Sequence, residues 1–247
     1  LFLMSAVACA LLAGACGLRT PRRRLAASLS AAGVLVLSGF AFARPPGALQ
    51  AVADLGEGTA LRHFIASKHG VVHTSAAGVG GDIVFGGNIY DGRTSVDPDV
   101  NSNRLDRLYM LSLVHPNPRR VLVVGMSTGA WTRALQGFPQ VETIDVVEIN
   151  PAYLQLIGRY ESLLPALSDP RVRIHVDDGR RWLKRHPNAR FDLIVQNTTY
   201  HWRANSTNVL SREYMTLVRR HLAPGGVVTM NTTGSYDVLA TARASFP

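Results

Sequence analysis

A glycine turn followed by an acid is the feature of this chain best suited to chemistry. The apolar run 121–124 ends in Gly125-Met126-Ser127-Thr128-Gly129, and Glu148 closes the next apolar run, 19 residues after Gly129. Glycines let the backbone turn tightly beside a ligand, and the helix that follows offers free N–H groups. A carboxylate at the tip of the second strand can accept hydrogen bonds from a ribose diol. The spacing predicts a nucleotide-binding βαβ unit, although a plain tight turn, with Glu148 paired to a helix N-terminus or an arginine, is the alternative.

Two adjacent acids follow the third expected strand. Asp177 and Asp178 precede Gly179 and open the next expected helix. An acid at that place favours the helix dipole, which gives Asp178 a structural interpretation as a cap. The functional interpretation is a hydrogen bond from an adenine amino group to Asp178. Because the two acids are adjacent, one can cap the helix while the other binds a ligand.

The loop after the fourth expected strand holds the candidate catalytic residues Asn197, Tyr200 and His201. In a parallel sheet this loop lies beside the ligand, where a transferred group would be placed. His201 is a candidate general base, although a single loop histidine is more often simply solvated. Trp202 either closes over a substrate or anchors the loop.

Short apolar runs alternate with amphipathic segments from Arg120 onward, which predicts an α/β fold with a doubly wound, mostly parallel sheet. Strands are expected at 120–125, 143–148, 171–176, 191–196 and 226–231. Helices are expected at 129–137, 151–160, 179–186, 209–222 and 236–245. Upstream, residues 70–95 predict a small antiparallel β unit, residues 104–114 a helix, and residues 47–67 a linker with a short helix.

The N-terminal region differs from the rest of the chain. Residues 1–18 and 25–43 are apolar and uncharged, and a basic turn from Arg19 to Arg24 separates them. Each stretch has about the 17–25 residues of a membrane helix, so we expect two transmembrane helices and a location in the inner or plasma membrane. A signal peptide is the alternative. The arginines favour a cytoplasmic turn between the two helices, which would place the chain after the second helix on the opposite side of the membrane. The supply of a cofactor instead favours a cytoplasmic catalytic domain.

Charge and cysteine content restrict the remaining function classes. The net charge is +9, and five arginines lie within residues 1–45 without any acid, so the basicity indicates a membrane flank rather than a nucleic-acid partner. Cys9 and Cys16 both lie in the apolar N-terminal region, so no disulfide framework and no cysteine metal site is expected elsewhere. Because the chain begins with Leu1 and stops soon after the fifth strand and helix, we expect a fragment with a truncated C-terminus.

The order of the motifs resembles that of the spermidine synthases, the polyamine aminopropyltransferases. The resemblance covers about residues 70–235 and rests on His115-Pro116-Asn117-Pro118, Val147-Glu148-Ile149-Asn150, Asp169-Pro170-Arg171-Val172, Asp177-Asp178-Gly179, Phe191-Asp192-Leu193-Ile194 and Leu222-Ala223-Pro224-Gly225-Gly226. It implies the Rossmann-like fold shared with S-adenosylmethionine-dependent methyltransferases, and a small-molecule acceptor. Some members of the family carry membrane helices and many form dimers, so the resemblance also implies a membrane anchor and a homodimer.

The resemblance also implies which residues bind the cofactor, S-adenosylmethionine or decarboxylated S-adenosylmethionine. Glu148 would bind the ribose and Asp178 the adenine. The full set of implied cofactor contacts is Gly125, Ser127, Thr128, Gly129, Glu148, Asp177, Asp178 and Gly179.

Departures from the family pattern put polyamine chemistry in doubt. The family acid that holds the amine of the decarboxylated cofactor corresponds to Thr128, and the acids of its catalytic loop correspond to Asn197 and Tyr200. An amide cannot take a proton at neutral pH, and Arg203 adds a positive charge to this loop.

Three hypotheses follow from these matches and departures. The first is a membrane-attached transferase that moves a methyl or aminopropyl group to an unknown, non-polyamine acceptor. The second is true polyamine aminopropyl transfer, and the third is a non-catalytic nucleotide-binding domain. The expected regions are the membrane helices at 1–45, the linker, β unit and helix at 46–114, and the nucleotide-binding α/β domain at 115–247.

Overall fold

A sheet of five parallel strands organises the part of the chain that the structure describes. In this computed structural model that part is Val7 with residues 60–197, 200–203, 206–232 and 234–246. The strands lie in the order β7-β6-β5-β8-β9. Their bounds are Arg120–Val124 for β5, Thr143–Glu148 for β6, Val172–Val176 for β7, Phe191–Gln196 for β8 and Leu222–Met230 for β9. The mostly parallel sheet predicted from the sequence is confirmed.

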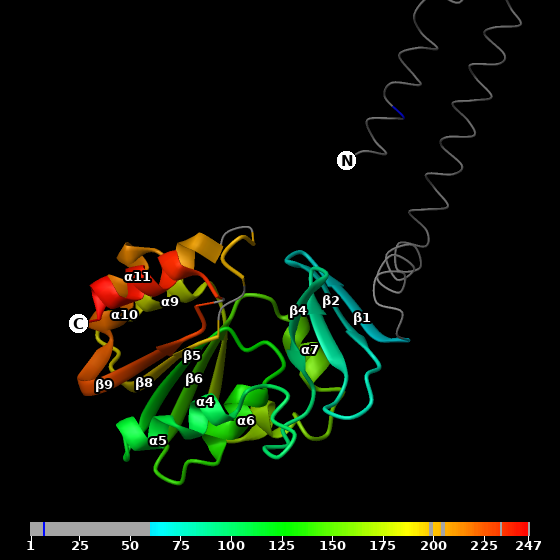
Figure 1. Cartoon of the computed structure of the whole chain (residues 1–247), viewed down its shortest axis with the longest axis horizontal. Helices are drawn as coiled ribbons and strands as arrows, with labels where there is room; N and C mark the ends of the chain where they lie inside the picture. The colour runs from blue at the N-terminus through cyan, green and yellow to red at the C-terminus, as the bar shows by residue number, and fades with distance from the viewer. Residues whose placement is uncertain (1–6, 8–59, 198–199, 204–205, 233, 247) are drawn as a thin grey trace, which may run out of the picture. The chain divides into compact units, whose positions relative to one another are not determined.

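Helices cover both faces of this sheet, as Figure 1 shows. On one face lie α4 (Asp106–Tyr109), α5 (Leu111–Val114) and α6 (Ala130–Gln136), and on the other lie α9 (Gly179–Arg185), α10 (Arg212–Arg220) and α11 (Tyr236–Ser245). Alternate residues of β5 serve the two layers. Val121 and Val123 pack with the α6 side, whereas Leu122 and Val124 pack with α9 and α10. Both sets are apolar because neither face of the sheet meets water.

A separate antiparallel sheet precedes the α/β part. Its strands β1 (Leu61–Ser67), β2 (Gly70–Ser75), β3 (Ile83–Gly86) and β4 (Ile89–Arg93) pair in sequence order. Helix α7 (Ala152–Ile157) packs against this sheet through Tyr153 and Leu156, which share a core with Val72 and Val84. The predicted β unit is therefore present, but Leu61–Ser67 forms a strand where a linker with a short helix was expected.

Several predicted boundaries need correction. The helix expected over 104–114 is two short helices, α4 and α5, which meet at Met110. The fifth strand begins at Leu222 rather than at residue 226, and α10 begins at Arg212 after the short 3-10 helix η1, Ser206–Val209. Helix α8 (Pro165–Ser168) was not predicted, because a single turn leaves no periodic signal in the sequence.

The membrane location predicted from the N-terminal region is contradicted. Among the helices that the structure describes, none is both long and apolar enough to cross a membrane. The stretches on which the prediction rested, residues 1–18 and 25–43, lie outside the described residues except for Val7. The fold described above belongs to the unit Glu57–Pro247.

The strand register gathers the predicted site residues at one edge of the parallel sheet. Val124 at the end of β5 pairs with Val147 of β6 and with Gln196 of β8. Gly125, Glu148 and Asn197 therefore lie at the same carboxyl edge. Chain order reverses between β5 and β8, and ligands of open α/β sheets bind at such a reversal.

Position 125 requires glycine for two reasons, its positive φ and the close approach of Asn197. Its φ is +86°, and a Cβ at this position would overlap the backbone carbonyl oxygen of Asn197. We expect Gly125→Ala to lower the free energy of unfolding by about 2–4 kcal/mol, because backbone strain and overpacking add. Urea denaturation followed by tryptophan fluorescence measures the loss.

Gly225 provides the matched control for this prediction. Its φ of +75° is similar, but a Cβ there would meet nothing within 4 Å. Gly225→Ala should therefore cost only the backbone strain, about 1 kcal/mol. Equal losses in the two variants would contradict a role for the contact with Asn197.

Candidate functional site

A cavity, called the larger cavity below, lies at the carboxyl edge of β5, β6 and β8. Its volume is about 490 Å³, and its wall includes Gly125, Ser127, Glu148, Asp177, Asp178, Gly179 and Asn197. Val124, Val147, Ile149 and Val209 supply apolar surface. A buried acid, two further acids and an apolar wall are the chemical types that a nucleoside requires.

Glu148 is buried beside the glycine turn. Its Oε2 atom accepts the backbone N–H of Met126 at 2.7 Å, and its Oε1 atom accepts the backbone N–H of Asn150 at 2.8 Å. Burial raises the pKa of Glu148, while these backbone N–H groups act in the opposite direction. Each carboxylate oxygen can accept a second hydrogen bond, so the group can hold the turn and still bind two hydroxyls.

Asp177 and Asp178 have different partners in the structure. Asp178 caps α9, because its carboxylate accepts the backbone N–H of Arg181 at 2.8 Å. Asp177 accepts the backbone N–H of Asp178 and forms ion pairs with Arg181 and Arg185. Both acids also line the larger cavity. Gly179 leaves no room for a side chain, since a Cβ would lie 2.6 Å from Cγ1 of Val124.

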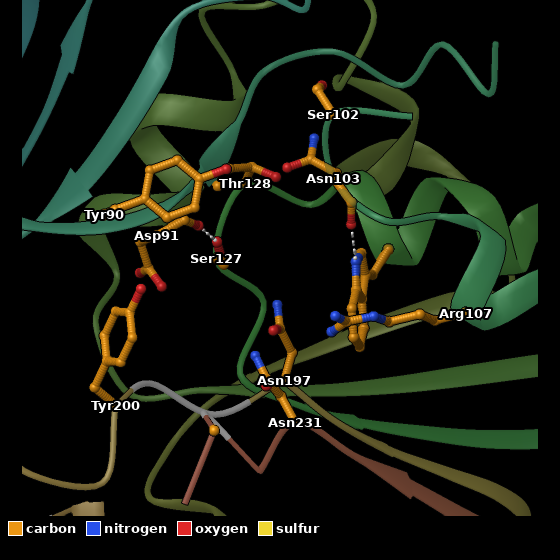
Figure 2. A pocket seen from close by; sticks show the side chains of 13 residues that line it. Tyr90, Asp91, Ser102, Asn103, Arg107, Ser127, Thr128, Asn197, Tyr200 and Asn231 are labelled. Atoms are coloured by element: carbon orange, nitrogen blue, oxygen red, sulfur yellow. Dashed lines mark hydrogen bonds between the residues drawn. The ribbon is translucent and has the colours of Figure 1, made fainter. Parts of the chain in front are cut away.

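A smaller cavity of about 320 Å³ adjoins the larger one. Figure 2 shows residues that line it, among them Thr128 from the glycine turn, Asn103 and Arg107 from the segment before and within α4, and Asn231 after β9. Three residues, Asp91, Ser127 and Asn197, line both cavities. The boundary between the cavities is therefore polar and combines the β unit with the parallel sheet.

The β unit contributes a carboxyl group to this boundary through Asp91 on β4. The Tyr153 hydroxyl donates to Oδ2 of Asp91, and the Ser127 hydroxyl donates to the Asp91 carbonyl oxygen. The residue is half-buried, but its carboxyl group is enclosed. Burial raises the pKa of Asp91 to about 7; the Tyr153 hydrogen bond lowers it, Glu148 raises it and Arg203 lowers it, in decreasing order of effect.

The β unit encloses this carboxyl group closely. A Cβ on Gly86 of β3 would overlap the Tyr153 hydroxyl, and it would lie 3.2 Å from Oδ2 of Asp91 and 3.3 Å from Nη2 of Arg203. Asp91, Tyr153 and Arg203 thus converge on the backbone of Gly86. Tyr153 is itself buried, and burial raises its pKa well above the ordinary value, so its hydroxyl stays protonated and donates.

The residues predicted from the sequence fall into three groups. Gly125, Ser127, Glu148, Asp177, Asp178, Gly179 and Asn197 line the larger cavity, and Thr128 and Tyr200 line the smaller one. Gly129 is the N-cap of α6, with a φ of +80°, and it is absent from the described walls of both cavities. His201 is exposed and is absent from the described walls of both cavities. Tyr200 stacks on Trp202, with ring centroids 5.3 Å apart.

The large side chains of Met126 and Trp131, close to the glycine turn, are absent from the described wall of the larger cavity. Met126 is buried in the core with α6, and the Trp131 ring N–H donates to the carbonyl oxygen of Asn103 at 2.8 Å. Trp131 forms part of the wall of the smaller cavity. The larger cavity thus keeps its volume beside Glu148.

Sequence reasoning missed Asp91 and Tyr153 as site residues. Asp91 follows the β-prone pair Ile89-Tyr90 and precedes Gly92, within β4. An acid beside a glycine in a β-prone run is the signal that could have found it. Tyr153 carried no such signal, because an aromatic residue in the first turn of a helix usually belongs to the core.

Comparisons with known proteins agree with this architecture. A protein-family model described as "Spermine/spermidine synthase domain" matches residues 109–238. Spermidine synthase 2 of Hyoscyamus niger is 31% identical over 114 residues, which are 46% of this chain and 37% of the relative. A polyamine aminopropyltransferase of Agathobacter rectalis is 36% identical over 87 residues, which are 35% of this chain and 30% of the relative. The matched stretch thus spans about a third of these curated relatives.

Solved structures show the same fold. A crystal structure of spermidine synthase in complex with the transition state analogue AdoDATO has a TM-score of 0.63 and 17% identity, covering 75% of this chain and 62% of that one. Spermidine synthase from Thermotoga maritima gives a TM-score of 0.61, also at 17% identity, with the same coverage. Because the family model covers more than half of the sequence, the chain belongs to the spermine/spermidine synthase family.

Proposed function

We propose that this protein is a transferase that binds an adenosyl sulfonium donor in the larger cavity and alkylates a small-molecule acceptor in the smaller one. The donor is S-adenosylmethionine or decarboxylated S-adenosylmethionine, and the group moved is methyl or aminopropyl. The position of Glu148 is the observation that carries the proposal. Its buried carboxylate lies beside the glycine turn, in the wall of a cavity large enough for a nucleoside.

The larger cavity supplies partners for each part of adenosine. The free lone pairs of Glu148 suit the ribose hydroxyls, and the apolar side chains of Val124, Val147 and Ile149 suit the faces of a purine. Asp178 offers a carboxylate oxygen for the adenine amino group beside its cap bond to Arg181. With adenosine so placed, the remainder of the donor extends past Ser127 to the boundary with the smaller cavity.

The bound donor supplies a sulfonium carbon that a nucleophile can attack without further activation of the leaving group. The chain contributes alignment, because holding two reactants in line can lower a barrier by about 7–11 kcal/mol. Asn197 and Ser127 border both cavities, and Thr128 and Tyr200 lie on the acceptor side. These polar, uncharged groups orient an acceptor by hydrogen bonds.

The second candidate function is aminopropyl transfer to a polyamine. Membership of the family and the names of the relatives favour it. The charges of the smaller cavity favour it less: within its described wall, Asp91 is the one acid, and Arg107 adds a positive charge. A diamine carries two positive charges at neutral pH, and a neighbouring guanidinium repels both. An acceptor with fewer positive charges fits this wall better.

Replacement of Glu148 tests the donor site. We expect Glu148→Ala to weaken binding of S-adenosylmethionine by about 10- to 100-fold, because hydrogen bonds to a charged group contribute about 1.5–3 kcal/mol. Isothermal titration calorimetry on the full chain measures the change, and circular dichroism checks that the variant is folded.

Asp145 on the same strand provides the control for that experiment. It is buried, and His175 Nε2 lies 2.8 Å from its Oδ1, but it lines neither cavity among the described residues. Asp145→Asn should bind the donor like the unchanged protein. Unaltered binding by Glu148→Ala, or an equal loss in both variants, would contradict the proposed ribose contact.

A direct assay decides between the two candidate functions. We expect the unchanged protein, incubated with putrescine and decarboxylated S-adenosylmethionine, to form no spermidine above a protein-free blank, because Arg107 and the single acid of the smaller cavity disfavour a diamine. Mass spectrometry of the products is the measurement. Spermidine formed in proportion to protein would establish the second candidate instead.

A further inference from the structure

We propose that Asp91 is the anionic group that faces the sulfonium of the bound donor, so that the site distinguishes a cationic donor from the neutral thioether left after transfer. This assignment rests on the proposed function and adds a residue that no sequence motif indicated. Its chemical basis is that a positive charge moved from water into an enclosed site needs a nearby negative charge.

Position is the first argument for Asp91. Adenosine bound between Glu148 and Gly179 places the donor sulfur where the two cavities meet, because the reacting carbon has to reach the acceptor. Of the described residues, Asp91, Ser127 and Asn197 border both cavities. Asp91 is the one of the three that can carry a charge.

Elimination of the other acids is the second argument. Glu148 accepts the backbone N–H groups of Met126 and Asn150, and its remaining lone pairs are assigned to the ribose hydroxyls. Asp177 is paired with Arg181 and Arg185, and Asp178 caps α9. In the described wall of the larger cavity these three and Asp91 are the acids. The hydrogen bond that Asp91 receives from the neutral Tyr153 hydroxyl leaves its charge available to a cationic ligand.

The electrostatics of the boundary support this role. Burial is the largest effect and raises the pKa of Asp91 to about 7. The Tyr153 hydrogen bond opposes it, the charge of Glu148 adds to it, and Arg203 has the smallest, opposing effect. The Asp91 carboxyl group thus exchanges its proton in the range around neutral pH. A sulfonium beside this carboxyl favours its charged form and displaces the proton, whereas a thioether does not.

Proton linkage of donor binding tests this assignment without any acceptor. Titrations of the full chain with S-adenosylmethionine at pH 6, 7 and 8, in buffers of different ionisation enthalpy, give the affinity and the protons released. We expect the affinity to rise about tenfold from pH 6 to pH 8, because the competent, ionised fraction rises by that factor. About half a proton should leave per donor at pH 7. S-adenosylhomocysteine, the neutral thioether, should show neither effect.

Variants connect the linkage to this carboxyl group. Asp91→Asn should bind S-adenosylmethionine with an affinity that no longer changes with pH. The Tyr153 hydrogen bond stabilises the charged form of Asp91 and lowers its pKa. Tyr153→Phe removes this bond and should therefore move the pH transition upward. Asp82 and Tyr160 form a similar pair elsewhere in the β unit, with the hydroxyl 2.9 Å from Oδ2 of Asp82. Asp82→Asn and Tyr160→Phe should leave the transition unchanged.

The other titratable and charged groups around Asp91 require one further control. In the described walls of the two cavities these groups are the following: Tyr153 and Glu148, Arg203, Lys68 and His69 of the turn between β1 and β2, Tyr90 and Tyr200, Arg107 of α4, and Asp177 and Asp178. One of them, His69, is a histidine, the side-chain type that most often exchanges a proton between pH 5 and 8. His69→Gln should retain the pH dependence, and its loss in that variant would assign the proton to the histidine.

The remaining outcomes separate the two proposals. An equal proton release on binding S-adenosylhomocysteine would show that the release is coupled to the amino-acid part of the ligand and not to the sulfonium. That result would overturn the assignment. Persistence of the linkage in Asp91→Asn would overturn it as well. Binding of both ligands without any pH dependence would reject the role of Asp91 and leave the donor site standing. Binding of neither ligand would reject the donor site and this assignment together.

Discussion

The glycine turn after β5 is held from two sides, and the site depends on this double attachment. On one side the Glu148 carboxylate accepts the Met126 backbone N–H, and on the other the Ser127 hydroxyl donates to the Asp91 carbonyl oxygen. Ser127 has a φ of +49°, which costs a non-glycine residue about 1–3 kcal/mol. The two hydrogen bonds offset that strain. The Ser127 hydrogen bond also joins the parallel-sheet part to the antiparallel unit, so a single turn shapes the walls of both cavities.

Much of the parallel sheet could be predicted because its strands are apolar on both faces and each is followed by a helix. That pattern located β5, β6, β7 and β8 to within a residue or so. The register of parallel neighbours then placed Gly125, Glu148 and Asn197 at one edge. The end of the sheet was harder, since Leu222-Ala223-Pro224-Gly225 reads as a turn and yet belongs to β9. Of these four residues Leu222 pairs with β8, at Phe191, and the register shifts before the next pair, Leu193 with Val227. A local pattern cannot reveal such pairing between strands.

The contribution of the β unit could not be predicted, for a physical reason. Asp91 and Ser127 are 36 residues apart, and Asp91 and Tyr153 are 62 residues apart. The contacts arise because α7 packs against β1 and β2 through Tyr153 and Leu156, which brings one sheet to the edge of the other. Sequence spacing predicts neighbours within an element or between adjacent parallel strands. The approach of two separate sheets follows from their packed side chains, and a lone sequence gives no sign of it. For His201 the opposite holds: its place in the loop after β8 indicated a candidate general base, but the residue is exposed and is absent from the described walls of both cavities.

The carboxyl groups of Glu148, at the end of β6, and Asp91, within β4, are coupled through the larger cavity that both line. Each is raised in pKa by burial, and the charge of Glu148 raises the pKa of Asp91 further. The backbone N–H groups at Met126 and Asn150 favour the charged form of Glu148. When Glu148 is ionised, the second negative charge is the costly one, since two like charges in an enclosed site repel each other. A cation between the two groups removes that cost and a neutral ligand does not. The same burial that keeps water from the boundary thus makes the charge of the ligand decisive for binding there.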